Sequence, residues 1–159
     1  MSDNKLISFN LLSVSTEQFA IIGDPPQKDE GINVTTKFRF GFDQNNRGIG
    51  VFTQFTFSNS SNSPFLLVEG GCHFQIAQSD WDSLKNEENN SIVLPKGFVA
   101  HLLMICVGTT RGLLHSKTEN TPFNKFFIPL LNVTKLVEKD LVFGLTESSS
   151  EKELASTPT

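Results

Sequence analysis

The fold of this chain is decided by two stretches, PFLLVEGGCHFQI at residues 64–76 and PKGFVAHLLMICVGTTRGLLHSK at residues 95–117. The first is dense in apolar side chains and carries Gly70 beside Gly71, which predicts a strand with a bulge or with another backbone close to it. The second places apolar residues at helical spacing after a proline, and proline suits the first turn of a helix. Pro129 then interrupts residues 123–137, which predicts an extended loop followed by a short helix.

The residues before this unit predict the rest of a sheet. Residues 32–42 and 49–57 alternate apolar and polar side chains, and turn-rich segments precede and follow the second of these strands. Residues 6–22 have the extended character of a broken edge strand. Such a sheet has one apolar face, which the long helix covers. The predicted class is α+β: a four-stranded antiparallel sheet with one long helix packed on one face and a short final helix.

Length and composition predict one domain over residues 1–145, followed by a tail. The chain has 159 residues, enough for one packed core. From residue 146 to residue 159, Ser, Thr and Glu dominate and apolar side chains are rare. A segment of that composition buries too little apolar surface to offset the entropy of ordering it. We therefore expect a disordered polar tail.

Charge and targeting signals narrow the class of protein. Lys and Arg number 13 against 17 Asp and Glu, a net charge of -4, and the basic residues are scattered, so nucleic-acid binding is not expected. The first residues lack the pattern of a signal peptide, and the longest apolar run, residues 98–107, is too short to span a bilayer. A cytoplasmic protein without membrane insertion is expected. Its two cysteines are then expected to be reduced.

The long helix is more apolar than one sheet requires. Its stripe at Phe98, Leu102, Ile105 and Cys106 is broadened on both sides, which predicts a second buried contact, between copies of the chain. Glycine four residues from glycine would let another backbone approach closely, although Gly112 equally suits a kink or a helix C-cap. The oligomer-interface candidates are Leu103, Val107, Gly108 and Gly112.

This order of elements resembles the SecB-like chaperones, holdases that bind unfolded chains in bacterial protein export and in some toxin–antitoxin systems. Members have a strand written approximately F-L-x-E-V-x-x-G-x-F-x-I, a long helix ending in R-G and a segment ending P-x-N-F. The matching residues here are Val68, Gly71, Phe74 and Ile76 in the strand, Arg111-Gly112 in the helix, and Ile128-Pro129, Leu131 and Asn132 in the closing segment. The resemblance covers residues 6–136. It implies the four-stranded fold, assembly into dimers or dimers of dimers through helices and sheet edges, and capture of unfolded or extended apolar polypeptides.

The chain departs from the export members on the solvated face of the sheet. Those members carry carboxylates there that help to dock the translocase motor SecA. Lys37 and Arg39 stand at the corresponding places here, and Leu67 stands where the strand motif has Glu. The resemblance therefore does not extend to the motor-docking surface.

The aromatic residues divide into core and groove candidates. The chain has 15 Phe, one Trp and no Tyr, and Phe supplies apolar area without a hydrogen-bonding group. Inward positions of the strands predict that Phe38, Phe40, Phe55 and Phe57 are core. The candidates for an exposed polypeptide-binding groove are Phe52, Phe65, Trp81, Phe123, Phe126 and Phe127.

No group of residues predicts catalysis or a bound cofactor. Cys72 and His73 are adjacent on a strand and point to opposite faces, and His101 and Cys106 do not share a helix face, so no metal site is expected. The acidic pairs Asp80/Asp82 and Glu87/Glu88 fall in a polar, solvated connection. The predicted function is therefore a non-enzymatic holdase or protein-binding module. The alternatives are an accessory protein dedicated to one partner, of the toxin–antitoxin type, and a small-ligand protein of the hot-dog type.

Overall fold

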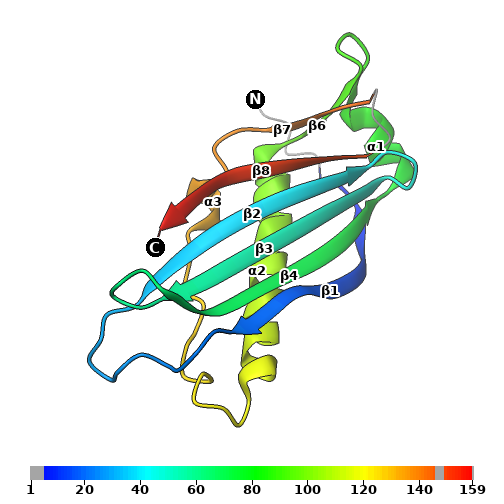
Figure 1. Ribbon diagram of the computed structural model, residues 1–159. Coiled ribbons are helices and arrows are strands. Elements are labelled where there is room, and N and C mark those ends of the chain that lie inside the picture. Colours follow the sequence, from blue (N-terminus) through cyan, green and yellow to red (C-terminus); the bar gives the residue numbers. More distant parts are fainter. Residues whose placement is uncertain (1–5, 146–148, 159) are drawn as a thin grey trace.

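The computed structural model describes residues 6–145 and 149–158, and its main feature is a five-stranded antiparallel sheet with one long helix on one face (Figure 1). The strands of this sheet are β1 (Phe9–Ile21), β2 (Asn33–Asp43), β3 (Gly48–Ser58), β4 (Pro64–Ile76) and β8 (Ser149–Pro158). They lie in the order β1-β4-β3-β2-β8. The predicted α+β class, with an antiparallel sheet, one long helix and a short later helix, is confirmed. The predicted count of four strands is wrong, because β8 adds a fifth.

Strict alternation gives β2 and β3 their shared inner face. The two strands pair without a break from Asn33↔Ser58 to Asp43↔Gly48. Because side chains alternate across a strand, one face receives the apolar residues. The predicted core residues Phe38, Phe40, Phe55 and Phe57 are 3 % exposed or less. Their prediction as core is confirmed.

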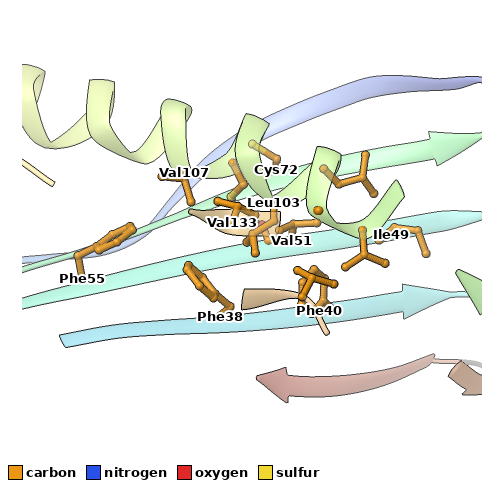
Figure 2. Packing of buried hydrophobic residues seen from close by; sticks show 14 of the residues in the cluster. Phe38, Phe40, Ile49, Val51, Phe55, Cys72, Leu103, Val107 and Val133 are labelled. Atoms are coloured by element: carbon orange, nitrogen blue, oxygen red, sulfur yellow. Dashed lines mark hydrogen bonds between the residues drawn. The ribbon is translucent and has the colours of Figure 1, made fainter. Parts of the chain in front are cut away.

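The long helix α2 (Lys96–Thr118) packs against β3 and β4, and Pro95 occupies its N-cap position. Figure 2 shows Leu103 and Val107 on the side of α2 that faces the sheet, in one buried cluster with Val51, Phe55 and Cys72. A buried hydrogen bond of 2.6 Å joins the hydroxyls of Thr53 on β3 and Thr110 on α2. The helix therefore lies close to the sheet at this point.

The adjacent glycines of β4 admit this close approach and form no bulge. A Cβ atom at Gly70 would collide with the Thr110 hydroxyl and lie 3.0 Å from Leu113 Cδ1. A Cβ atom at Gly71, on the opposite face, would lie 2.9 Å from the ring of Phe52. The register between β3 and β4 is unbroken here. The pairing of β1 with β4 is irregular instead, between Leu11 and Ser13 and between Thr16 and Gln18. β1 is therefore the expected edge strand, but it is continuous and bulged, not broken.

A second, small sheet covers one end of the molecule and was not predicted. It consists of β5 (Lys85–Asn86), β6 (Ser91–Leu94) and β7 (Leu141–Gly144), beside helix α1 (Gln78–Leu84). Ala77 occupies the N-cap position of α1, and no side chain caps this helix. The carboxylate of Asp80 is buried and accepts a hydrogen bond of 2.8 Å from the backbone N–H of Ser8. Asp80 therefore links α1 to the residue before β1 and does not lie in a solvated loop.

After α2 the chain folds back over the end of the sheet and then forms α3 (Val133–Leu136). The side chain of Asn132 caps α3 by accepting from the backbone N–H of Lys135. The long helix does not end at Arg111-Gly112, the helix end in the SecB-like motif, but continues to Thr118. The predicted loop and short helix are confirmed.

The end of the chain differs most from the prediction. Ser149–Pro158, expected to be disordered, forms β8 and pairs antiparallel with β2. The other residues of the predicted tail, 146–148 and 159, lie outside the described residues. Backbone pairing explains the difference, because the edge of β2 offers N–H and C=O groups to any extended segment, whatever its side chains.

Candidate functional site

Only one of the six aromatic groove candidates is open to solvent. Phe127 is 65 % exposed, whereas the other five are at most 9 % exposed. Those five are Phe52, Phe65, Trp81, Phe123 and Phe126. They belong to three separate packing clusters, so they do not form an exposed groove on this chain.

The first cluster lies where the loop after α2 folds onto the sheet. The rings of Phe65 and Phe126 are 4.9 Å apart, and Phe123 lies 6.3 Å from both. Arg111 fixes the loop from α2 by donating to the backbone carbonyls of Ile128 at 3.2 Å and Pro129 at 3.1 Å. The loop thereby buries Phe123 and Phe126 and leaves the neighbouring Phe127 outside.

The second cluster joins the small sheet to the large one. The ring of Phe42 on β2 stacks between Trp81 of α1 and Phe143 of β7, with ring centroids 5.4 and 4.8 Å away. Both stacked pairs have interplanar angles of 9°. Trp81 is therefore a core residue, for which the small sheet supplies a cover that the local sequence did not reveal.

The third cluster lies on the outer face of the sheet, opposite α2. The ring of Phe52 lies over Gly50 and Gly71, with the guanidinium of Arg39 4.2 Å above its centroid. Arg39 also pairs with Glu69 on β4 at 2.9 Å and with Glu151 on β8 at 3.1 Å. These carboxylates raise the pKa of Arg39 against the opposing effect of desolvation, the largest single influence. Beside this stack is a hollow of about 700 Å³.

The four helix candidates for an oligomer interface face in different directions. Leu103 and Val107 are buried against the sheet within this chain, so their side chains are not available to a second copy. Gly108 and Gly112 lie on the exposed side of α2, with no atom within 4 Å of a Cβ built on either. Part of the wide apolar stripe is therefore buried in the core of the same chain and needs no second copy to cover it.

The exposed side of α2 is nevertheless almost uncharged and continues onto its neighbours. Residues 97–110 contain no Asp, Glu, Lys or Arg. Met104, 47 % exposed, lines a shallow hollow with Leu130, which is 93 % exposed. On β1, Leu11 and Val14 pair with the inward-facing Phe74 and Cys72, so they lie on the helix side of the sheet and are about half exposed.

We call these residues the helix-side surface: Leu11, Val14, Met104, Gly108, Gly112 and Leu130. In Figure 1, β1 and α3 lie on opposite sides of α2, which places the exposed ridge of the helix between them. By length and composition alone α2 could also cross a membrane, as can the core helix of a soluble protein. An 18-residue stretch of α2 has a mean hydropathy of 1.5, yet only 44 % of this stretch is buried inside the protein. More than half of a strongly apolar helix segment is therefore left without full cover.

The cysteines and histidines do not converge. Cys72 and Cys106 are free and fully buried between β4 and α2, whereas His73 lies on the outer face beside Phe52. The Cys106 sulfur lies 3.1 Å from the backbone carbonyl oxygen of Val51. Its interaction with the Cys72 thiol and its burial raise the pKa of Cys106, so this thiol stays protonated. Among the described residues, no three His, Cys, Asp or Glu side chains are grouped so as to hold a metal ion.

The sequence pattern does not predict the exposure of Leu11, Val14, Met104 or Leu130. The first two were hidden because an edge strand with bulges breaks the alternation that marks an outward-facing apolar residue. The uncharged run at residues 97–110 was a usable signal for Met104. No local signal marks Leu130, because its exposure depends on how Arg111 and the two buried phenylalanines fold the loop.

Family models, curated proteins and solved structures give no significant match to this chain.

Proposed function

We propose that this protein is a SecB-like holdase, a non-enzymatic binding protein that holds unfolded or extended apolar polypeptide segments. The observation that carries the proposal is the helix-side surface. It combines exposed Leu, Val and Met side chains from three elements with a helix face that has no Asp, Glu, Lys or Arg between Gly97 and Thr110. Contiguous exposed apolar surface on a soluble chain is typical of protein-binding sites.

The topology supports the same proposal. Antiparallel strands followed along the chain by a long helix on one face of their sheet agree with the α+β arrangement that the SecB-like resemblance implies. The exposed glycines of α2 would let a second copy of the helix approach, so we include a homo-oligomer in the proposal. Two buried free thiols are compatible with the cytoplasm, where we place the protein.

Docking of a translocase motor is not part of the proposal. Lys37 and Arg39, at the places where export members carry carboxylates, pair with Glu153 and Glu151 of β8. The outer face therefore carries cations at these places, and these cations pair with glutamates of the same chain. At these two places it carries cations where the resemblance would require carboxylates for the motor.

Suppression of aggregation tests the proposal. A chemically denatured model enzyme is diluted into buffer, and its light scattering is followed with and without the protein. We expect suppression at stoichiometric excess, and at least tenfold weaker holding by Leu130→Asp, since a buried leucine contributes about 1.5–3 kcal/mol. Asn89→Asp adds the same charge to the exposed β5–β6 turn and serves as the control.

Two outcomes would contradict the proposed holdase function or the proposed binding surface. Failure of the wild-type protein to suppress scattering would reject a general holdase. Affinity capture of a single partner from the native host would then favour the partner-dedicated alternative. Equal holding by Leu130→Asp and wild type would reject the helix-side surface as the binding surface.

A further inference from the structure

β8 is held on the large sheet differently from the strands at its centre. Strands β2, β3 and β4 each bury apolar side chains at alternate positions. In β8, by contrast, Glu151, Lys152 and Glu153 are exposed and Leu154 is only partly buried. Over residues 151–154, where its side chains are described, β8 therefore buries little apolar surface, and backbone pairing with β2 runs along the strand.

The side-chain contacts of β8 add two ion pairs on the outer face. Glu153 lies 3.3 Å from Lys37, and Glu151 lies 3.1 Å from Arg39. The two carboxylate side chains are 48 % and 64 % exposed. Ion pairs this open to solvent are weak because water screens them. These two ion pairs therefore favour an acidic strand at this edge but contribute little to the stability of its attachment.

Many contacts of β2 do not involve β8. It pairs with β3 over its whole length, and its inward side chains Phe38, Phe40 and Phe42 are at most 3 % exposed. Arg39 retains its contacts with Glu69 and the Phe52 ring, neither of which belongs to β8. Departure of β8 would therefore leave an intact, cation-bearing strand edge with unpaired N–H and C=O groups, which is a template for another strand.

A cavity beside Leu154 indicates that β8 does not fill this edge fully. It has a volume of about 420 Å³ and is lined mainly by Phe38, by residues 135–141 and by Leu154 itself. Leu154 pairs in register with Phe38. An apolar side chain larger than leucine at that position would have room to extend into the cavity.

We propose that β8 is an internal occupant of a strand-binding edge, and that an extended polypeptide replaces it on β2. The chemistry of the edge defines the segment: two acidic residues at alternate positions, each able to pair diagonally with Arg39 or Lys37, followed by an apolar residue opposite Phe38. This inference rests on the proposed function, since it names one place where a held polypeptide lies. Strand addition of this kind takes affinity from the backbone and specificity from alternate side chains.

A labelled peptide copying residues 149–158 tests the exchange on the full-length protein. The tethered β8 competes at a high effective concentration, so the peptide is expected to bind wild type weakly. The double variant Glu151→Lys, Glu153→Lys weakens the internal strand against Lys37 and Arg39. We expect it to bind the peptide at least tenfold more tightly, measured by fluorescence anisotropy. A peptide carrying the same two lysines is expected to lose this gain.

A reversible lock supplies the matched control. Gly41 and Glu151 are register partners, and a Cβ at Gly41 would make only ordinary contact, 3.6 Å from the Phe52 ring. Oxidising the variant Gly41→Cys, Glu151→Cys should tie β8 to β2 and abolish peptide binding, and reduction should restore it. Equal peptide binding by the oxidised and reduced forms would overturn the proposal, as would equal binding by wild type and the lysine variant.

The same samples separate this inference from the proposed function. Aggregation suppression is measured on the wild-type protein alone, so its failure rejects the holdase and leaves peptide exchange to be judged by anisotropy. A dimer that forms on reduction of the lock and is dissociated by the peptide would identify the β8 of a second copy as the occupant. That result would overturn the assignment to client segments.

Discussion

Gly70 and Gly71 are neighbours in β4, yet each serves a different layer of the molecule. The absent side chain of Gly70 makes room for Thr110 and Leu113 of α2, and that of Gly71 makes room for the Phe52 ring on the outer face. Adjacent side chains of a strand point to opposite faces, so two successive glycines leave space beside the backbone on both faces of the sheet. The helix can therefore approach closely enough for Thr110 to bond Thr53 across the layers.

Replacing Gly70 by alanine should destabilise the protein. The added methyl group collides with the Thr110 side chain in a packed core, and overpacking of this kind costs about 1–3 kcal/mol. Urea denaturation followed by circular dichroism would measure the free energy of unfolding. The control is Gly97→Ala in the first turn of α2, where no atom lies within 4 Å of the new Cβ and stability should hold or rise. Equal effects of the two substitutions would contradict the close-approach explanation.

Among the elements, the loop between α2 and α3 does most to determine which apolar groups face solvent. Two phenylalanines anchor it inward, and the guanidinium of Arg111 holds the carbonyls of Ile128 and Pro129. The side chain of Asn124 braces its start by donating to the carbonyl of His115 at 3.0 Å. Phe127 and Leu130 are exposed because the residues around them are fixed in this way.

Substitution of Arg111 by methionine should loosen this loop and leave the sheet unchanged. Hydrogen bonds to a charged donor contribute about 1.5–3 kcal/mol, and both carbonyls would lose theirs. Amide hydrogen exchange should accelerate over residues 123–131, with little change in β2, β3 and β4. Arg111→Lys keeps the charge and the aliphatic stem but not the forked pair of donors, so we expect an intermediate rate. Unchanged exchange in the methionine variant would show that the aromatic anchors suffice.

At the scale of the whole molecule, the sheet has two faces with different surfaces. The helix side is apolar and nearly uncharged, and the outer face carries the cations and carboxylates that join β2, β4 and β8. Such a division allows association through one face while the other stays hydrated. The exposed glycines on the ridge of α2 mark the place where a second helix can approach most closely.

Light scattering coupled to gel filtration would test this assembly. We expect a dimer or tetramer for the wild-type protein and a monomer for Gly108→Arg, because a buried charge without a partner is strongly unfavourable. Ser79→Arg places the same charge on the exposed surface of α1 and should leave the assembly intact. A monomeric wild-type protein at micromolar concentration would contradict the proposed homo-oligomer.

The sequence determined those parts of the protein whose structure is set by local periodicity and backbone restrictions. Alternation gave β2 and β3, helical spacing after Pro95 gave α2, and Pro129 separated the loop from α3. The inward phenylalanines followed from the same alternation. These features need little information from distant residues, because side-chain direction repeats with the secondary structure.

Only the tertiary structure decided which of the other apolar groups are covered. Phe65, Phe123 and Phe126 are buried because segments far apart in the chain meet, and Leu130 is exposed for the same reason. The polar segment at residues 149–158 became a strand because β2 offered an unpaired edge. Backbone pairing and loop packing depend on neighbours in space, so no local pattern in the sequence could have revealed them.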